Sequence, residues 1–187
     1  MDFQETLLAR FYIKLKSDQT KLLANVSTAN IVKDEIKITK LRGKFFKTMG
    51  YSRDGENYLH PEESIHLMKE GLLTICEEEK PLSRKLVMER ILPDKETYEN
   101  AQIYNHLTKL SFVIRRSDSF IYELYERQSF KKSSSIMPLY FVKKCYPLDN
   151  FSIEQEVTTP IMLAIYDEGD VTLIINSNKV IPKVVNK

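Results

Sequence analysis

The sequence has few of the residues that build disulfide scaffolds, metal sites and phosphate-binding loops. It contains two cysteines, three histidines and five glycines among 187 residues, and no tryptophan. Cys76 and Cys145 lie far apart, without a C-x-x-C pair, so we expect both to be buried, reduced thiols. The scattered glycines form neither a P-loop nor a dinucleotide-binding loop, and no zinc pattern occurs. We therefore expect no metal and no cofactor.

A strong overall charge and long apolar runs are also missing. Lys and Arg (28) nearly balance Asp and Glu (26), so a nucleic-acid surface would have to be local. No apolar run approaches the roughly 18 residues of a membrane span, and Asp2 and Glu5 stand where a signal peptide would be basic. With 42% hydrophobic residues the chain can bury a core. We expect a soluble intracellular globular protein without a membrane partner.

Helix signals are clearest in the middle of the chain. Pro61, followed by two glutamates and later by Gly71, predicts a short helix over 61–70. Ser83 can cap a second helix that Pro93 ends. Before residue 41 the pattern is weaker: residues 5–18 have nearly helical spacing, and residues 31–41 alternate somewhat like a strand.

The second half changes from helix to strand. Asp94 opens a helix that runs to about residue 110, and a strand follows over 111–116. Residues 117–137 are polar and predict an insertion or linker, with a helical turn near 120–125. The rest is rich in β-formers, and Glu168-Gly169 predicts a two-residue hairpin turn.

The histidines are candidates for chemistry. His60 and His66 flank a Glu-Glu pair but stand six apart, whereas the H-E-x-x-H metal motif needs four. We therefore interpret them as structural. His106, near Tyr98 and Tyr104, allows a general-base role of the kind nucleases use, although a packing role is the more common one at such a position.

Two charged clusters are candidate binding sites. The run KITKLRGKFFK holds five cations without an acid, and these can neutralise phosphates while its phenylalanines anchor the segment to the core. Arg115 and Arg116 form a second basic candidate. The tip Asp167, Glu168, Gly169 and Asp170 carries three acids, which favours a solvated turn or a plug for a partner's basic groove over a Ca²⁺ site. The residues of the basic run are Lys37, Lys40, Arg42, Lys44 and Lys47.

Several segments together resemble a known family. GKFFKTMG, then YLHPEESIHLMKEG, KPLSRKLVMERIL and YENAQIYNHLTKLSFVIRR, and finally TPIMLAIYDEGDVTLI, are similar to the larger non-catalytic subunit of the eukaryotic tRNA-splicing endonuclease, subunit fifty-four. The similarity covers about residues 40–116 and 138–182. Ser111-Phe112 departs from it, because the family usually has Gly-Tyr there.

The resemblance implies an α+β or α/β protein. It would have a small α-rich N-terminal domain over 1–93, best supported from residue 36, and an endonuclease-like α/β domain with a mixed sheet over 94–187. The segment 117–137 would be an insertion inside that second domain.

The resemblance also implies a role in RNA processing. Catalytic subunits of that enzyme use a Tyr, a His and a Lys, and no histidine follows His106 here. The chain would then be a nuclear scaffold subunit of a hetero-tetramer, paired with the other subunits and with pre-tRNA. It would contact pre-tRNA through the basic run and its partners through the acidic tip. The alternatives are a nuclease that uses His106 with a tyrosine, and an α/β protein-interaction module unrelated to RNA.

Overall fold

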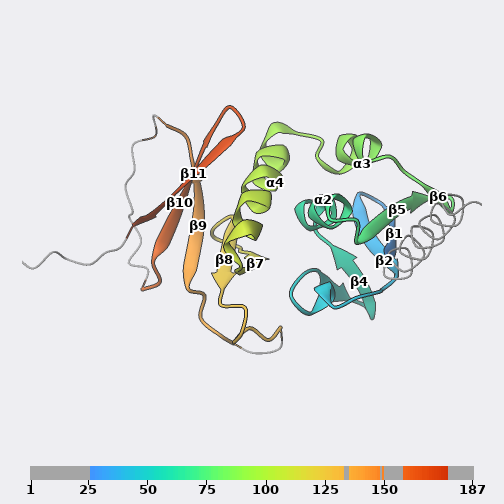
Figure 1. Ribbon diagram of the computed structural model, residues 1–187, viewed down its shortest axis with the longest axis horizontal. Helices are drawn as coiled ribbons and strands as arrows, with labels where there is room; N and C mark the ends of the chain where they lie inside the picture. The colour runs from blue at the N-terminus through green and yellow to red at the C-terminus, as the bar shows by residue number, and fades with distance from the viewer. Residues whose placement is uncertain (1–25, 133–134, 148, 150–157, 177–187) are drawn as a thin grey trace, which may run out of the picture. The chain divides into compact units, whose positions relative to one another are not determined.

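The computed structural model describes residues 26–132, 135–147, 149 and 158–176, which fall into two compact units (Figure 1). The first unit contains residues 26–46 and 50–91, and the second contains 47–49 and the described residues from 92 to 176. Each unit has its own mixed sheet with helices, so the predicted mixed α and β class is confirmed. That 1–93 and 94–187 are separate domains stays a prediction.

The sheet of the first unit has six strands in the order β3-β4-β2-β1-β5-β6. β1 and β5 are parallel, and the other neighbours are antiparallel. The buried face of the sheet is built from alternate residues, such as Ile36 and Ile38 of β2. The strands are β1 (Ser27–Val32), β2 (Glu35–Lys40), β3 (Tyr51–Arg53), β4 (Glu56–Leu59), β5 (Leu73–Glu77) and β6 (Lys80–Pro81).

The expectation of an α-rich first unit is therefore wrong for its described part. Two hairpins turn at Lys33-Asp34 and at Glu78-Glu79, where all four residues have positive φ. Such turns favour Asn and Gly, so these charged pairs gave no turn signal in the sequence. Residues 5–18, for which helical spacing was noted, lie outside the described residues.

Two described helices accompany this sheet, and both were predicted. α2 (Pro61–Lys69) begins at Pro61, and Gly71 beyond its end has a φ of +70°. α3 (Arg84–Ile91) begins after Ser83, whose hydroxyl oxygen accepts a hydrogen bond from the Leu86 N–H at 3.3 Å. Buried side chains on both helices, including Leu67 and Val87, complete the core of the first unit.

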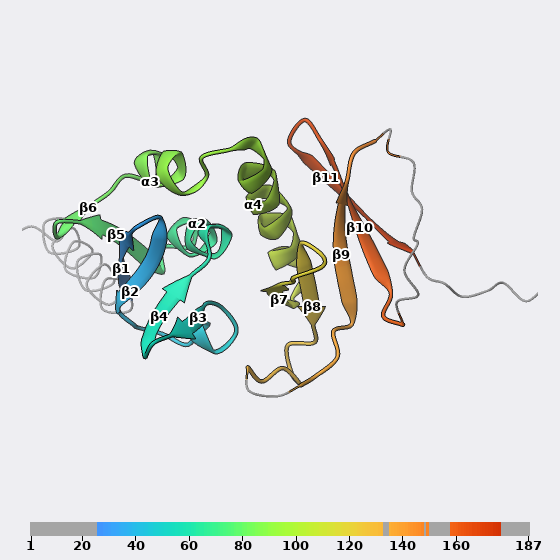
Figure 2. The same ribbon diagram turned by 180° about the vertical axis from the view of Figure 1, so that it is seen from behind.

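The second unit is a five-stranded sheet in the order β11-β10-β9-β8-β7, with β9 and β10 parallel. One helix, α4 (Lys95–Leu107), packs on one face of it and continues into a 3-10 turn, η2 (Thr108–Leu110) (Figure 2). The Asp94 carboxylate caps α4 by accepting a hydrogen bond from the Thr97 N–H at 2.8 Å. The strands are β7 (Val113–Arg116), β8 (Tyr122–Tyr125), β9 (Tyr140–Cys145), β10 (Ile161–Asp167) and β11 (Asp170–Asn176).

The segment predicted as an insertion contributes a strand to this sheet. β8 lies between β7 and β9, where a helical turn was expected. Tyr122 and Leu124 are buried against α4, and the Tyr122 hydroxyl donates to the Asn100 carbonyl oxygen at 3.0 Å. A strand of four residues within a polar segment carries too little periodicity to stand out.

β10 is apolar on both faces because the sheet buries both of them. Met162, Ala164 and Tyr166 pack with α4, whereas Ile161 and Leu163 lie with Cys145 on the opposite face. Such a continuous apolar run is typical of a central strand. No helix in the described part of the chain is long and apolar enough to cross a membrane.

The expectation that both cysteines are buried holds for one of them. Cys145 is buried, and this burial raises the pKa of its thiol to about 11. Cys76, on β5, is half-buried. The thiolate is the reactive form of cysteine, so Cys145 is present almost entirely as the unreactive thiol at neutral pH.

Ser111, where the family pattern has Gly, follows η2 in a left-handed conformation with a φ of +62°. Glycine adopts this conformation without the Cβ conflict that other residues meet. We expect Ser111→Gly to raise the free energy of unfolding by about 1 kcal/mol, measured by urea unfolding. Thr108→Gly, at a φ of −58°, is the matched control and should lower it. A Ser111→Gly variant no more stable than the parent would contradict this explanation.

Candidate functional site

The predicted RNA-binding lysine on β2 is already paired inside the first unit. Lys37 Nζ lies 2.5 Å from the Glu56 carboxylate on β4, and this hydrogen-bonded partner raises the pKa of Lys37. Beside it, Arg53 on β3 forms a two-point ion pair with Glu35 and lies over the Tyr58 ring at 4.9 Å. The exposed face of β2, β3 and β4 is therefore a network of paired charges, and Lys37 is the weakest member of the basic run as an RNA contact.

The other cations of the run lie at the end of β2 and in the residues that follow it. Lys40 and Lys44 are exposed, and no carboxylate among the described residues pairs with either. Arg42 is held through its backbone: its N–H donates to the Ser27 hydroxyl oxygen at 2.7 Å, and that hydroxyl donates to the Arg42 carbonyl oxygen at 2.8 Å. Lys47 ends the 3-10 turn η1 (Phe45–Lys47) and groups with the second unit. The five cations thus do not all belong to one unit.

The segment after the basic run is fixed by a buried glutamate. Glu63, 2% exposed on α2, accepts hydrogen bonds from the Gly50 N–H at 2.9 and 3.0 Å and from the His60 N–H at 2.9 Å. The His60 ring stacks on Tyr51 at 4.8 Å between centroids. The Glu63 carboxylate therefore holds two loops against the first turn of α2 through hydrogen bonds. This role adds to its favourable interaction with the helix dipole.

The histidines form no obvious catalytic group. Among the described residues, no group of three His, Cys, Asp or Glu side chains is placed to hold a metal ion. His106 lines a polar pocket of about 540 Å³ together with Lys109 and Asp170. No tyrosine lines this pocket, and Tyr104 is buried against Tyr122 in the core. The nuclease alternative requires His106 to lie beside a tyrosine. The described residues do not show such a pair.

The second basic candidate lies at the edge of the other sheet. Arg115 and Arg116 end β7, opposite Glu123 and Tyr122 of β8 respectively. Arg116 is exposed and Arg115 is half-buried. Arg115 therefore faces an opposite charge directly across the strands.

The acidic tip is a tight, exposed hairpin turn, as predicted. Asp167 pairs directly with Asp170 across the end of β10 and β11, and Glu168 and Gly169 between them have φ of +44° and +106°. All four residues are exposed. Like charges placed opposite each other disfavour the strand pair, so the fold does not require these acids. The tip therefore presents a concentrated negative charge to the solvent.

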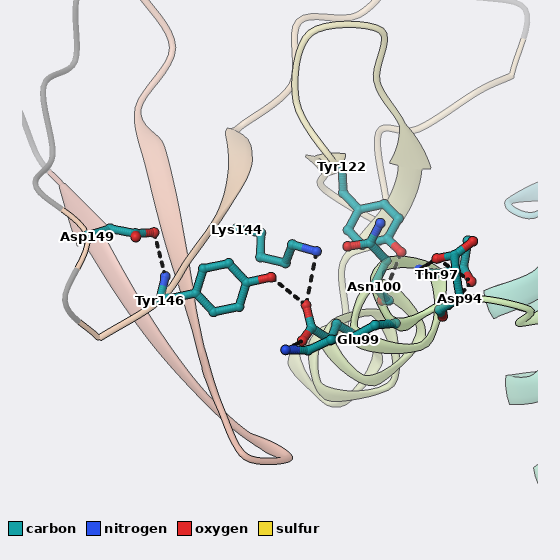
Figure 3. A network of polar contacts seen from close by, with 9 residues as sticks. Asp94, Thr97, Glu99, Asn100, Tyr122, Lys144, Tyr146 and Asp149 are labelled. Atoms are coloured by element: carbon teal, nitrogen blue, oxygen red, sulfur yellow. Dashed lines mark hydrogen bonds and ion pairs between the residues drawn. The ribbon is translucent and has the colours of Figure 1, made fainter.

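Close to this tip lies a buried charge network that the sequence did not reveal (Figure 3). Glu99 of α4 is 1% exposed, and its Oε2 accepts hydrogen bonds from Tyr146 Oη at 2.7 Å and from Lys144 Nζ at 3.2 Å. Burial raises the pKa of the Glu99 carboxyl, but the bonds from Tyr146 and Lys144 outweigh it, so this pKa lies below its ordinary value. The hydrogen bond to Glu99, with burial, raises the pKa of Tyr146 to about 12. The carboxylate is thus kept charged and the phenol protonated.

Comparisons with known proteins find similarity over part of the chain. Residues 22–77 match the family model described as the N-terminal part of tRNA-splicing endonuclease subunit Sen54. The tRNA-splicing endonuclease subunit Sen54 of Mus musculus is 36% identical over 95 residues, which is 50% of this chain and 18% of the mouse protein. The probable subunit sen54 of Schizosaccharomyces pombe is 34% identical over 84 residues, which is 43% of this chain and 22% of that protein.

The stretch matched by the family model, residues 22–77, contains the features described above for the first unit. It includes the ion-paired face of β2, β3 and β4, the basic run and the loops tied by Glu63. The match covers about a fifth of the length of these relatives. The resemblance predicted from the sequence is confirmed: residues 22–77 are similar to the N-terminal part of the tRNA-splicing endonuclease subunit Sen54, and two curated Sen54 proteins are similar to part of the chain.

Proposed function

We propose that this chain is a non-catalytic scaffold subunit of the tRNA-splicing endonuclease, which helps to position pre-tRNA while other subunits excise the intron. The observation that carries the proposal is the match of residues 22–77 to the N-terminal part of Sen54. The lack of any histidine after His106 supports the non-catalytic role, since the catalytic triad implied by the resemblance needs one there. The partners would be the other subunits of a hetero-tetramer, and the compartment would be the nucleus.

The competing function is RNA cleavage by the chain itself, because His106 lines a pocket with Lys109 and Asp170. Incubating the purified chain with intron-containing pre-tRNA separates the two. A scaffold leaves the RNA intact alone and supports cleavage once the other subunits are added. Cleavage by the chain alone that His106→Ala abolishes would establish the nuclease function instead.

The basic run is proposed to contact the phosphate backbone of pre-tRNA. Lys40 and Lys44 are the best candidates, because both are exposed and no described carboxylate pairs with them. We expect Lys40→Glu/Lys44→Glu to weaken binding of the assembled complex to pre-tRNA at least tenfold at moderate salt. The slope of log K against log salt should fall by about 1.5, since each lost phosphate contact contributes about 0.7–0.9. Filter binding at several salt concentrations measures both quantities.

The matched control reverses two exposed lysines elsewhere in the same unit. Lys80→Glu/Lys85→Glu produces an equal change in net charge, on β6 and α3. This variant should keep most of the affinity and the parental salt slope. Equal losses of affinity in the two variants would mean that only net charge matters, and would refute a local contact at the basic run.

The acidic hairpin is proposed to be a contact with another subunit of the complex. The triple variant Asp167→Asn/Glu168→Gln/Asp170→Asn removes three charges while keeping side-chain size and the turn glycine. We expect weaker assembly of the complex, most clearly at low salt where charge attraction is least screened. Size-exclusion chromatography of the co-expressed subunits measures it.

The melting temperature of the isolated triple variant is measured as well, to show that a loss of assembly does not come from unfolding. Removing like charges that face each other should leave its melting temperature unchanged or slightly raised. Glu78→Gln/Glu79→Gln, at the exposed turn between β5 and β6, is the control and should assemble normally. Normal assembly of the triple variant would reject the hairpin as an interface.

A further inference from the structure

A pocket of about 430 Å³ lies beside the acidic hairpin, within the second unit. Its volume falls within the range of about 300–1,000 Å³ typical of small-ligand sites. The lining comes from the first half of α4, the chain just after β9, and the junction of β10 with the hairpin. The lining residues are Lys95, Tyr98, Glu99, Tyr146, Pro147, Tyr166, Asp167 and Glu168.

One lining residue, Glu99, has a buried carboxylate oxygen without a hydrogen-bond donor. Glu99 Oε2 has its two donors, but no described group donates to Oε1. The nearest cation, Lys95 Nζ, lies 3.7 Å from Oε1, and its side chain is 84% exposed. Buried polar atoms in native proteins almost always have a partner, so an unbonded one at a pocket indicates a missing donor.

The walls of the pocket define which donor fits. Three tyrosines line it, and Tyr98 and Tyr146 are each 41% exposed. Three carboxylates, those of Glu99, Asp167 and Glu168, outnumber the single ammonium group of Lys95 in the lining. Lys144, which bonds Glu99 Oε2, is the other cation facing this carboxylate. The remaining negative charge and the exposed aromatic rings favour a cation that can also stack.

We propose that this pocket receives an arginine side chain from a partner protein. The planar guanidinium can donate to Glu99 Oε1 and to the hairpin carboxylates while its face lies against a tyrosine ring. Lys95, being exposed, can move aside at little cost. The inference deepens the interface role proposed for the hairpin and rests on it for the identity of the partner. The pocket chemistry itself is testable on the isolated chain.

The test is a titration of the full chain, carrying ¹³C-labelled tyrosine, with N-acetyl-arginine amide. We expect saturable NMR shifts of the Tyr98, Tyr146 and Tyr166 rings at millimolar concentration. The neutral citrulline analogue should give no saturation, and the lysine analogue should bind several-fold more weakly. Asp167→Asn/Glu168→Gln and Tyr98→Ala should each weaken arginine binding at least fivefold. Asp170→Asn is the matched control, because Asp170 belongs to the same tip but lines the other pocket.

Several results would overturn the proposal. These are an absence of saturable shifts, equal binding of the arginine and lysine analogues, or an Asp170→Asn effect as large as that of the double variant. Saturable shifts of the same rings with inorganic phosphate would also overturn it, because they would indicate an anion site. None of these measurements involves other subunits, so failure of the complex to assemble would leave this result intact.

Discussion

Gly50→Ala is expected to lower the free energy of unfolding of the first unit by about 3 kcal/mol or more. Gly50 has a φ of +68°, which already disfavours any residue with a Cβ. A Cβ at this position would also lie 2.5 Å from the Tyr58 carbonyl oxygen and 2.5 Å from the Phe46 ring. The loop cannot move away easily, because the Gly50 N–H is bonded to the buried Glu63 carboxylate. Chemical unfolding followed by tyrosine fluorescence measures the loss.

Gly43 provides the matched control for this prediction. It has a similar φ of +77°, but a Cβ there would meet nothing within 4 Å. Gly43→Ala should therefore cost about 1 kcal/mol, which is the backbone penalty alone. Equal losses at the two glycines would show that close packing around Gly50 has no part in the effect.

Glu99→Ala is expected to lower the free energy of unfolding by about 3 kcal/mol. The substitution removes the partner of Lys144, whose side chain is only 12% exposed, and the acceptor of the Tyr146 hydroxyl. Leaving one member of a buried ion pair without the other typically costs about 3–5 kcal/mol. Glu96→Ala, on an exposed position of the same helix, is the control and should change stability little. Similar losses in both variants would contradict the importance of the buried network.

The same carboxylate predicts a dependence of stability on pH. Burial raises the pKa of Glu99, but its bonds to Tyr146 and Lys144 bring the folded-state value below the ordinary 4.5. The unfolded chain therefore binds the proton more readily, and the stabilisation is complete above about pH 4.5 and is lost as pH falls towards the folded-state pKa. The stability difference between the parent and Glu99→Gln should accordingly shrink as pH falls below 4.5. A difference that stays constant from pH 6 to pH 3 would contradict the depressed pKa.

The helices were predictable because their start and stop residues act locally. Pro61, Ser83 and Asp94 each stand at or just before the first residue of a helix, and Gly71 follows the end of α2 in the left-handed conformation it favours. The β10–β11 hairpin was predictable for the same reason, since Glu168-Gly169 carries its own turn signal.

The strands of the first unit were harder to predict because their turns use unusual residues. Lys33-Asp34 and Glu78-Glu79 adopt positive φ without a glycine or asparagine. Such charged pairs are typical of a solvated loop, although here the strands on either side pair in register. Here the pairing of β1 with β2 and of β5 with β6 overrides the local preference of the turn residues.

The candidate site was predictable where charges cluster in sequence and not where they meet in space. The acidic tip is contiguous, so its exposure could be anticipated. Glu99 and Tyr146, in contrast, are 47 residues apart, and no pattern in the sequence relates them. Likewise, the pairing of Lys37 with Glu56 depends on the register of β2 beside β4, which composition does not reveal.

The most direct test of the central proposal is affinity purification of the tagged chain from its native cells. We predict that the catalytic subunits of a tRNA-splicing endonuclease are recovered with it, and that the eluate excises introns from pre-tRNA. Recovery of the chain without those subunits, under salt conditions that preserve the complex, would contradict the proposed scaffold role.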